Sequence, residues 1–307
     1  DLVRSRGLGD VYKRQGKHAG EVQAQSGHDI VGFENLQTAM IQDQLIDLDD
    51  LNEEIIKKWG PWHPIAKEAC FLNGHWKAIA RMSVAFHATY REDYFSQAGE
   101  RVPDSWSDVL RAARVLRGRD HPVGFAISQC GDANNSLYQI LWGFGGKTVS
   151  PEGEVAIESA ETEEAIAYVQ EVFGLMDREV LAWDNAGNNR FILSGRGSWT
   201  LNPASVYMSA KTSNPDLASK LNHHGALTGP KGRFGIGDFY SFGIWKFARN
   251  KQAAKDFLRF FYEEENQNRY IETGGGFNLP AHPHFDGHPV WRRDPKLQGI
   301  IGYTKWQ

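Results

Sequence analysis

Cysteine is scarce in this 307-residue sequence, in which Cys70 and Cys130 are the only two. Two isolated cysteines form neither a metal-binding pair nor a disulfide framework. Long apolar runs are absent too, since no stretch approaches the ~18 consecutive apolar residues of a membrane-spanning helix. There is no surplus of basic charge, with 34 Lys and Arg against 38 Asp and Glu. The composition therefore does not indicate a disulfide scaffold, a membrane-spanning chain or a nucleic-acid-binding protein.

Catalytic and metal-binding motifs are equally scarce. The patterns G-x-S-x-G, H-E-x-x-H and C-x-x-C do not occur. Residues 229–237, GPKGRFGIG, lack the Lys-Ser/Thr pair of a phosphate-binding loop and do not open a helix. In residues 281–289, AHPHFDGHP, interleaved prolines and a glycine favour a solvated loop over a zinc site at the three histidines and Asp286. We therefore expect no metal and no cofactor.

The two ends of the sequence look incomplete. Residues 1–15, DLVRSRGLGDVYKRQ, have neither an apolar period nor the anatomy of a signal peptide. They resemble library-adapter sequence translated in frame, so we expect a non-native leader and exclude it from fold prediction. The natural N-terminus, with any export signal, would then be missing, and the ending GYTKWQ suggests a cut C-terminus. The sequence leaves open whether such a fragment folds alone.

The strongest local pattern is a helix in residues 105–118. Ser105 can cap this helix with Asp108 three residues later, a single apolar stripe follows, and Gly118 ends it.

Two further segments predict helices. Residues 159–176 have an apolar stripe that includes Ile166, and residues 250–271 predict one helix that starts at Asn250 with Phe257 facing inward.

Short extended runs lie between these helices, among them residues 123–128, VGFAIS, and 239–247, FYSFGIWKF. Helices that alternate with strands predict an α/β fold. One α/β pattern interrupts another without a linker, which predicts two lobes joined by crossing strands.

Seven motifs occur in an order and spacing that is specific as a set. They are SGHDIV, YREDYFSQAGERVPDSWSDVL, LWGFGG, FILSGRGSW, GALTGPKG, NKQAAKDFLRFF and TGGGFNLPAH. In this order the chain resembles, from about Gly16 to His284, the family 1 extracellular solute-binding proteins of bacterial ABC importers. The resemblance implies a two-lobed periplasmic-binding fold of type II, a ligand held between the lobes, and no catalysis.

The same resemblance implies how the chain is divided. The first lobe would comprise residues 16–89 and 229–285, and the second would comprise residues 90–228 and 286–307. Hinge strands would cross near Tyr90 and Gly229, and ligand contacts to both lobes would favour a closed state that the transporter recognises.

Two departures from the family pattern leave the ligand open. Tyr90 is followed by Arg91 and Glu92 where the family has an asparagine-lysine pair, and Ala80-Arg81 stands where a Gly-Ile-Pro turn is expected. Arg81 lies in an apolar stretch, so its charge must pair with a nearby acid or reach a ligand that carries a carboxylate or phosphate.

Aromatic rings can stack on the apolar faces of a sugar, and acidic or amide side chains can hydrogen-bond to its hydroxyls. For the first lobe the resemblance points to Phe33, Glu34 and Asn35 after the strand DIVGF, although a turn with a capping Asn35 is equally compatible. Asp238 and Tyr240 enter a strand that returns to this lobe, where Tyr240 can stack on a ligand or be buried with one hydrogen bond.

For the second lobe, Asp132, Asn134 and Asn135 can contact hydroxyls or simply cap a helix start. A strand followed by Asn202-Pro203 is expected to deliver Asn202 and Ser205 to the crevice.

The triple glycine of TGGGFNLPAH follows a predicted helix end. Gly274 is placed to be the left-handed cap. Gly275 and Gly276 then need another reason, which is either close approach of the backbone to a ligand or a flexible stop before Pro280.

The predicted function is capture of a carbohydrate or polyol in the periplasm or outside the cell, by a monomer that is either free or lipid-anchored and that delivers the ligand to an ABC permease. The first alternative keeps this role with an anionic ligand, an acidic sugar or a phosphorylated polyol, because of Arg81. The second alternative is a glycan-active hydrolase or lyase, motivated by the aromatic and acidic content, although sequence cannot show two carboxylates at glycosidase separation.

Overall fold

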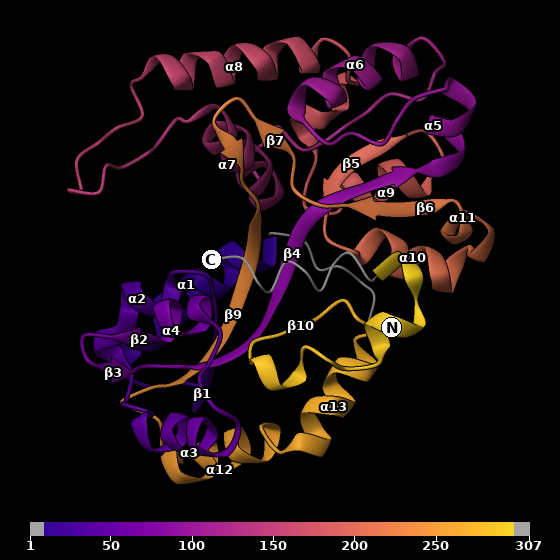
Figure 1. Ribbon diagram of the computed structural model, residues 1–307. Helices are drawn as coiled ribbons and strands as arrows, with labels where there is room; N and C mark the ends of the chain where they lie inside the picture. The colour runs from indigo at the N-terminus through magenta and orange to yellow at the C-terminus, as the bar shows by residue number, and fades with distance from the viewer. Residues whose placement is uncertain (1–8, 298–307) are drawn as a thin grey trace. The chain divides into compact units, whose positions relative to one another are not determined.

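The computed structural model describes the backbone of residues 9–297 and the side chains of residues 16–297. The chain forms two compact units. Residues 86–236 form one, here called the central unit, and residues 10–85 with 237–297 form the other, here called the N-terminal unit. Strand β4 (Ile79–Arg91) runs from the N-terminal unit into the central unit, and β9 (Ile236–Ile244) begins where the chain returns (Figure 1).

The N-terminal unit contains a mixed set of helices and short strands. Before the chain leaves it, the elements are α1 (Gly9–Ala24), β1 (Ile30–Glu34), α2 (Gln37–Ile41), α3 (Asp49–Trp59), α4 (Pro64–Cys70), β2 (Phe71–Leu72) and β3 (His75–Trp76). After the return they are β9, α12 (Lys251–Phe261), α13 (Glu264–Thr273), β10 (Leu279–Pro280) and α14 (Val290–Arg293). The sheet order is β1-β9-β4-β10, with β1 antiparallel to β9 and β10 antiparallel to β4.

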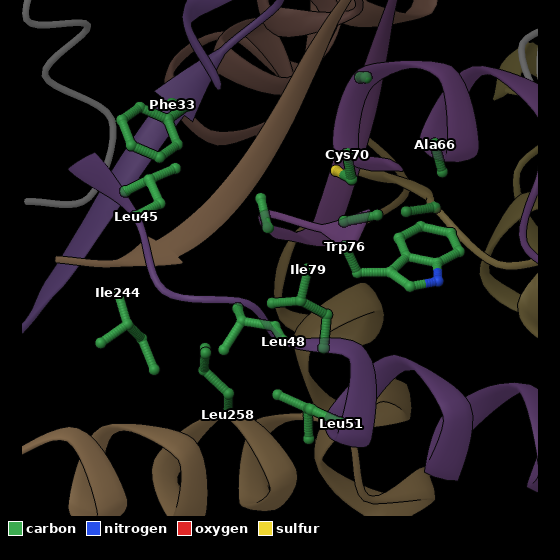
Figure 2. Packing of buried hydrophobic residues seen from close by; sticks show 14 of the residues in the cluster. Phe33, Leu45, Leu48, Leu51, Ala66, Cys70, Trp76, Ile79, Ile244 and Leu258 are labelled. Carbon is green, nitrogen blue, oxygen red and sulfur yellow. The ribbon is translucent and has the colours of Figure 1, made fainter. Parts of the chain in front are cut away.

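The core of this unit lies between its sheet and the helices α3 and α12. Leu48 and Leu51 meet Leu258 of α12, and Ile244 of β9 lies nearby (Figure 2). On the surface the same two helices are joined by ion pairs from Lys255 to Asp50 at 2.8 Å and from Arg259 to Glu54 at 2.8 Å. The buried leucines carry most of the packing energy, because exposed ion pairs contribute little.

The central unit is mainly helical, with short strands that pair with the end of β4 or, in the last two, with each other. Its elements are α5 (Glu92–Ala98), α6 (Trp106–Arg117), α7 (Gly131–Phe144), α8 (Ala160–Phe173), α9 (Gly187–Leu193), β5 (Trp199–Asn202), α10 (Ser205–Ser213), α11 (Pro215–Ser219), β6 (Leu221–His224), β7 (Thr228–Gly229) and β8 (Gly232–Arg233). Strands β5 and β6 pair antiparallel with the last residues of β4. Asn202, the end of β5, lies opposite His87.

The predicted cap of α6 is confirmed. Ser105 Oγ accepts the Asp108 backbone N–H at 3.1 Å, and Trp106, Val109 and Leu116 are buried. This capping contact satisfies one of the backbone donors that a helix start leaves free.

Helix α8 is capped by Ser159, but its buried stripe differs from the prediction. Ile166 is 53% exposed, and Tyr168 is buried in its place with its hydroxyl bonded to the Trp106 carbonyl at 2.8 Å. The choice of face depends on this contact with α6, which the periodicity of α8 does not contain.

Two other expectations about elements are wrong. The predicted helix of residues 250–271 is two helices, because Glu263 is extended (ψ 145°) between α12 and α13. Tyr262 is buried at this break with its hydroxyl bonded to the Ala80 carbonyl, and Phe257 is 51% exposed. The run 123–128 forms no strand, only a single bridge from Val123 to Trp199.

The triple glycine also differs from the prediction. Gly274 has a right-handed φ of −71°, whereas Gly275 (φ 60°) and Gly276 (φ 90°) are left-handed. Gly275 therefore reverses the chain after α13, one residue later than expected.

The chain boundaries differ in part from the sequence-based division. The crossings lie at 85/86 and 236/237 rather than near Tyr90 and Gly229. Residues 286–297 belong to the N-terminal unit and not to the central unit, and Trp291 is buried there with Nε1 bonded to the Gly276 carbonyl at 3.0 Å. The rest of segment 286–307, including GYTKWQ, lies outside the described residues, as do residues 1–8 of the expected leader; α1 begins at Gly9 within that leader.

Within the described part of the chain, no helix combines the length and the apolar character needed to cross a membrane.

Candidate functional site

The predicted ligand-binding residues form two groups, one in each unit. In the N-terminal unit, the register of β1 and β9 places Glu34 opposite Tyr240. Burial alternates along β9, so that Phe239 and Ser241 are buried while Asp238 and Tyr240 are half-buried. Since alternate residues of a strand share a face, Glu34, Asp238 and Tyr240 belong to the less buried face of this sheet.

Asn35 joins the end of β1 to β9. Its backbone has φ 50°, a left-handed conformation that asparagine tolerates better than most residues. Its Oδ1 accepts the Phe239 N–H at 2.8 Å, and its Nδ2 donates to Asp238 Oδ1 at 3.2 Å. Asn35 therefore fixes the turn and orients Asp238. It is exposed and does not cap the next helix, because the N-cap of α2 is Leu36, so the buried capping turn of the sequence analysis is not found.

Phe33 lies in the core, so its predicted role as a ligand contact is wrong. Its side chain is 1% exposed and lies beside Leu45 (Figure 2), and its ring meets Trp245 edge-on with 6.0 Å between centroids. The β1 alternation explains this, because Phe33 and Val31 point to the buried side and Glu34 does not.

Arg81 lies on β4 and is half-buried. Its Nε donates to the Tyr270 hydroxyl at 3.1 Å. The predicted alternative, an ion pair with a nearby acid, is not found among the described residues.

Gly275 and Gly276 have a structural explanation that involves no ligand. Both are left-handed, which favours glycine over every other residue. A Cβ on Gly276 would lie 3.0 Å from Leu297 Cδ1 and 3.2 Å from two atoms of the Trp291 indole. The need for glycine at these positions is therefore no argument for a ligand.

The group in the central unit is centred on Asn202. This side chain is 1% exposed, and its Nδ2 donates to the Pro203 carbonyl at 2.7 Å and to Ser205 Oγ at 2.8 Å. Its Oδ1 accepts from Asn188 Nδ2 at 2.5 Å. The structure thus brings Asn202 and Ser205 together within a network that also includes Asn188, and their delivery to a ligand crevice stays a prediction.

Asp132 joins the same network through Asn188, whose Nδ2 lies 2.7 Å from Asp132 Oδ2. The capping alternative for residues 132–135 is wrong, because the N-cap of α7 is Cys130 and these residues lie inside the helix. Asn185 Oδ1 accepts the Asp132 N–H instead, at 3.0 Å. Of the two predicted asparagines, Asn135 is buried and Asn134 is exposed.

Asn188 and Asn189 are the residues that sequence reasoning missed. Asn189 Nδ2 donates a hydrogen bond to Ser205 Oγ at 3.2 Å. Ser205 Oγ in turn donates to Asn189 Oδ1 at 3.4 Å. The stretch DNAGNNR (184–190) has three asparagines before and within a short helix, a density of amides that could have indicated a polar site. The network consists of amides, a hydroxyl and one carboxylate, which are groups that bind sugar hydroxyls.

His224 lies on β6, opposite Ala88 of β4. Its Nε2 accepts the Trp199 indole N–H at 2.8 Å, and its Nδ1 lies 2.9 Å from the Gly225 carbonyl. Burial lowers the pKa of His224 to about 4, so the ring is neutral at neutral pH. His224 therefore adds no charge to this part of the central unit at neutral pH.

The histidine-rich loop is held by local hydrogen bonds. His282 is buried, with Nε2 3.0 Å from the Gly60 carbonyl and Nδ1 accepting the His284 N–H at 3.2 Å. His63 Nε2 lies 3.0 Å from Asp286 Oδ1. These contacts fix the loop against the N-terminal unit.

A different set of possible metal ligands occurs in the N-terminal unit, at Asp47, Asp49 and His75. His75 Nδ1 lies 2.7 Å from Asp49 Oδ2, and Lys77 Nζ lies 2.5 Å from Asp47 Oδ1. All three residues are partly exposed, and the lysine already neutralises one carboxylate. The contacts are those of a surface ion-pair network.

A surface hollow of about 450 Å³ lies in the central unit beside Asn189. Its other walls come from α9 and α10 and from the Asp184–Arg190 ion pair, in which Arg190 Nη2 lies 2.7 Å from Asp184 Oδ1. The hollow shares only Asn189 with the network around Asn202.

Several solved structures have this fold. MalE3 of T. maritima with maltose bound has a TM-score of 0.82 at 19% identity, over 95% of this chain and 74% of that one. A sugar transporter from Arthrobacter chlorophenolicus A6 with bound laminaribiose has a TM-score of 0.80 at 17% identity, over 94% and 74%. An ABC transporter solute-binding protein from Agrobacterium radiobacter K84 in complex with ribitol has a TM-score of 0.83 at 16% identity, over 95% and 77%.

These likenesses establish the fold as that of the two-lobed periplasmic binding proteins. At identities this low they say nothing about a shared ligand. No curated protein matches the chain. The family model for bacterial extracellular solute-binding proteins matches residues 11–299, which is nearly the whole sequence. The chain therefore belongs to the bacterial extracellular solute-binding proteins.

Proposed function

We propose that this protein binds a carbohydrate or polyol outside the cytoplasm and delivers it to an ABC importer, acting as a monomer by binding and not by catalysis. Membership of the solute-binding family supports the role. The ligands in the structures of similar fold, which include maltose, laminaribiose and ribitol, support the ligand class. We further propose that the two compact units are the two lobes of such a protein.

The observation that carries the ligand class is the composition of the two residue groups. In the N-terminal unit an aromatic ring, Tyr240, lies opposite the carboxylate of Glu34 and two residues from Asp238 on the same face. A tyrosine ring suits the apolar face of a sugar, and each carboxylate can accept from two neighbouring hydroxyls.

In the central unit the network of Asp132, Asn188 and Asn202 supplies a preformed set of donors and acceptors. Its members hold one another in place, so binding a hydroxyl there would order few additional side chains.

The test is calorimetric titration with maltose, laminaribiose, ribitol and a wider set of sugars. We expect Tyr240→Ala to lower the affinity for the best ligand by about tenfold or more, because it removes a stacking ring. Tyr138→Ala is the matched control, since Tyr138 is an exposed tyrosine of the central unit that stacks on Trp142.

Asp132→Asn tests the central group. The amide oxygen can still accept from Asn188, so the fold should hold while the charge that faces the ligand is lost. We expect weaker binding with an unchanged unfolding midpoint. Binding of no sugar or polyol, or sustained turnover of an oligosaccharide, would contradict the proposal.

A further inference from the structure

Arg81 occupies an aromatic setting in the N-terminal unit. Its guanidinium carbon lies 5.2 Å from the centre of the Phe242 ring and 5.8 Å from that of Tyr270. Phe261 links these two rings, with edge-on contacts of 5.8 Å to Phe242 and 5.3 Å to Tyr270. Two rings, from β9 and α13, therefore contact this cation, and a third ring from α12 packs against both of them.

Among the arginines of residues 16–297, Arg81 alone combines partial burial with the lack of a counter-charge. Most of the others form ion pairs, namely Arg91, Arg101, Arg111, Arg114, Arg117, Arg190, Arg196, Arg233, Arg259 and Arg293. Those without an ion pair are exposed, namely Arg119, Arg178, Arg249, Arg269 and Arg292. Only Arg81 is both half-buried and without a carboxylate partner in that range. A charge withdrawn from water in this way costs free energy until a partner is supplied.

The unused donors of Arg81 are its two Nη groups. Arginine has five N–H donors, and only Nε–H has an acceptor within the described residues, the Tyr270 hydroxyl. That hydroxyl in turn donates to Met82 Sδ at 2.9 Å, which fixes its direction. The guanidinium plane is thus held at its Nε end while the planar fork of Nη groups stays available.

Arg81 lies close to the candidate group of the N-terminal unit. Phe242, which its guanidinium faces, is two residues from Tyr240, on the same half-buried face of β9. Residues two apart on a strand are about 7 Å apart. Glu34 lies opposite Tyr240. The face therefore carries carboxylates at one end and an unpaired guanidinium toward the other.

We propose that the Arg81 guanidinium is a subsite for the oxyanion of the ligand, a carboxylate or a phosphate on a sugar or polyol. This inference rests on the proposed function and narrows its ligand class to acidic members. A planar fork of Nη donors binds such a group in bidentate fashion, whereas a neutral hydroxyl leaves the charge unpaired. Repulsion by Glu34 and Asp238 orients the ligand, with its hydroxyls toward the acids and its anionic group toward Arg81.

The experiment compares glucose, glucuronate and glucose 6-phosphate, and likewise galactose and galacturonate, by calorimetry with the full chain at one ionic strength. We expect at least one anionic member to bind about tenfold or more tighter than its neutral counterpart. The glucuronate and phosphate arms distinguish a carboxylate from a phosphate.

Three variants locate the effect. Arg81→Gln should abolish the preference for the anion, and Arg81→Lys should retain only part of it, because lysine lacks the planar fork. Tyr270→Phe keeps the ring but removes the hydroxyl that holds Nε, and we expect a smaller loss of the preference. The control is Arg269→Gln, which changes an exposed arginine on the same helix as Tyr270 that has no ion pair within residues 16–297, and it should leave the preference unchanged.

The outcomes distinguish failure of the Arg81 subsite from failure of the proposed function on which it rests. Equal binding of neutral and anionic sugars, or a preference that survives Arg81→Gln, overturns the subsite and leaves the proposed function standing. Binding by no member of the set or of the wider sugar library overturns both. If Arg81→Gln fails to fold, as judged by circular dichroism and the unfolding midpoint, the Tyr270→Phe result decides.

Discussion

Asn35 and Phe239 make a reciprocal pair of hydrogen bonds. The Asn35 backbone N–H donates to the Phe239 carbonyl at 2.7 Å, and the Phe239 N–H donates to the Asn35 side-chain Oδ1 at 2.8 Å. The second bond replaces the backbone carbonyl that a continuing strand would offer, so that β1 can turn away while β9 stays paired. The half-buried face with Glu34 and Tyr240 depends on this arrangement, because it fixes the register of the two strands.

Replacement of Asn35 should therefore destabilise the N-terminal unit. Asn35→Ala removes the acceptor for Phe239 and places alanine at φ 50°, and we expect a loss of about 1–3 kcal/mol in the free energy of unfolding. Asn35→Gly removes the same acceptor without the left-handed strain, so it should cost less than Asn35→Ala. Urea unfolding measures both. Equal stability of Asn35→Ala and the parent protein would show that water replaces the side chain without cost.

Two histidines with lowered pKa values, the buried His282 and the half-buried His224, predict a loss of stability in weak acid. Burial lowers the pKa of both His224 and His282 to about 4, from an ordinary value of 6.5. In each ring one nitrogen accepts a hydrogen bond, from the Trp199 indole or from the His284 N–H, and protonation there would break it. The folded protein keeps both rings neutral while the unfolded chain takes up protons below about pH 6.5.

The stability that these rings contribute is therefore complete above pH 6.5 and is lost as the pH falls toward 4, by up to about 3 kcal/mol for each ring. Urea unfolding at a series of pH values measures the slope. His282→Gln should be less stable near neutral pH but should lose less stability on acidification than the parent protein. A midpoint that does not change over this range would contradict the assignment of neutral rings.

The elements whose signals are local could be predicted from the sequence. The cap of α6 needs only Ser105 and Asp108, three residues apart. Where a contact with a distant segment determines whether a side chain is buried, the prediction fails. The sequence places Phe33 beside a ligand, but its neighbour in the core, Trp245, lies more than two hundred residues further along the chain.

The same limit applies to the candidate site. Asn202 and Ser205 are close in sequence and can be predicted together, whereas Asn188 reaches Asp132 across 56 residues. No pattern in a single sequence indicates that pairing, because it exists only once α7, α9 and β5 have packed. Arg81 could be predicted in part. Its apolar sequence neighbours indicate that its charge needs a partner, but they do not indicate that its Nε donates to the Tyr270 hydroxyl.

The glycines after α13 provide the last prediction. Gly276→Ala places a Cβ at φ 90°, within 3.0 Å of Leu297 Cδ1 and 3.2 Å of the Trp291 ring, whose indole N–H bonds to the Gly276 carbonyl. Backbone strain and crowding act together, and we expect a loss of about 2–4 kcal/mol in the free energy of unfolding. Gly287→Ala is the matched control, because a Cβ there would have no neighbour within 4 Å and the backbone is not left-handed, so it should be neutral or slightly stabilising.

If Gly276→Ala costs no more than Gly287→Ala, then the chain after α13 can relax away from Trp291 and the packing of α14 does not depend on this turn. Tryptophan fluorescence distinguishes the cases, since loss of the turn would expose Trp291, which is 2% exposed in the folded protein. An unchanged spectrum with reduced stability would assign the cost to backbone strain at φ 90°, whereas a shifted spectrum would assign it to displacement of the indole.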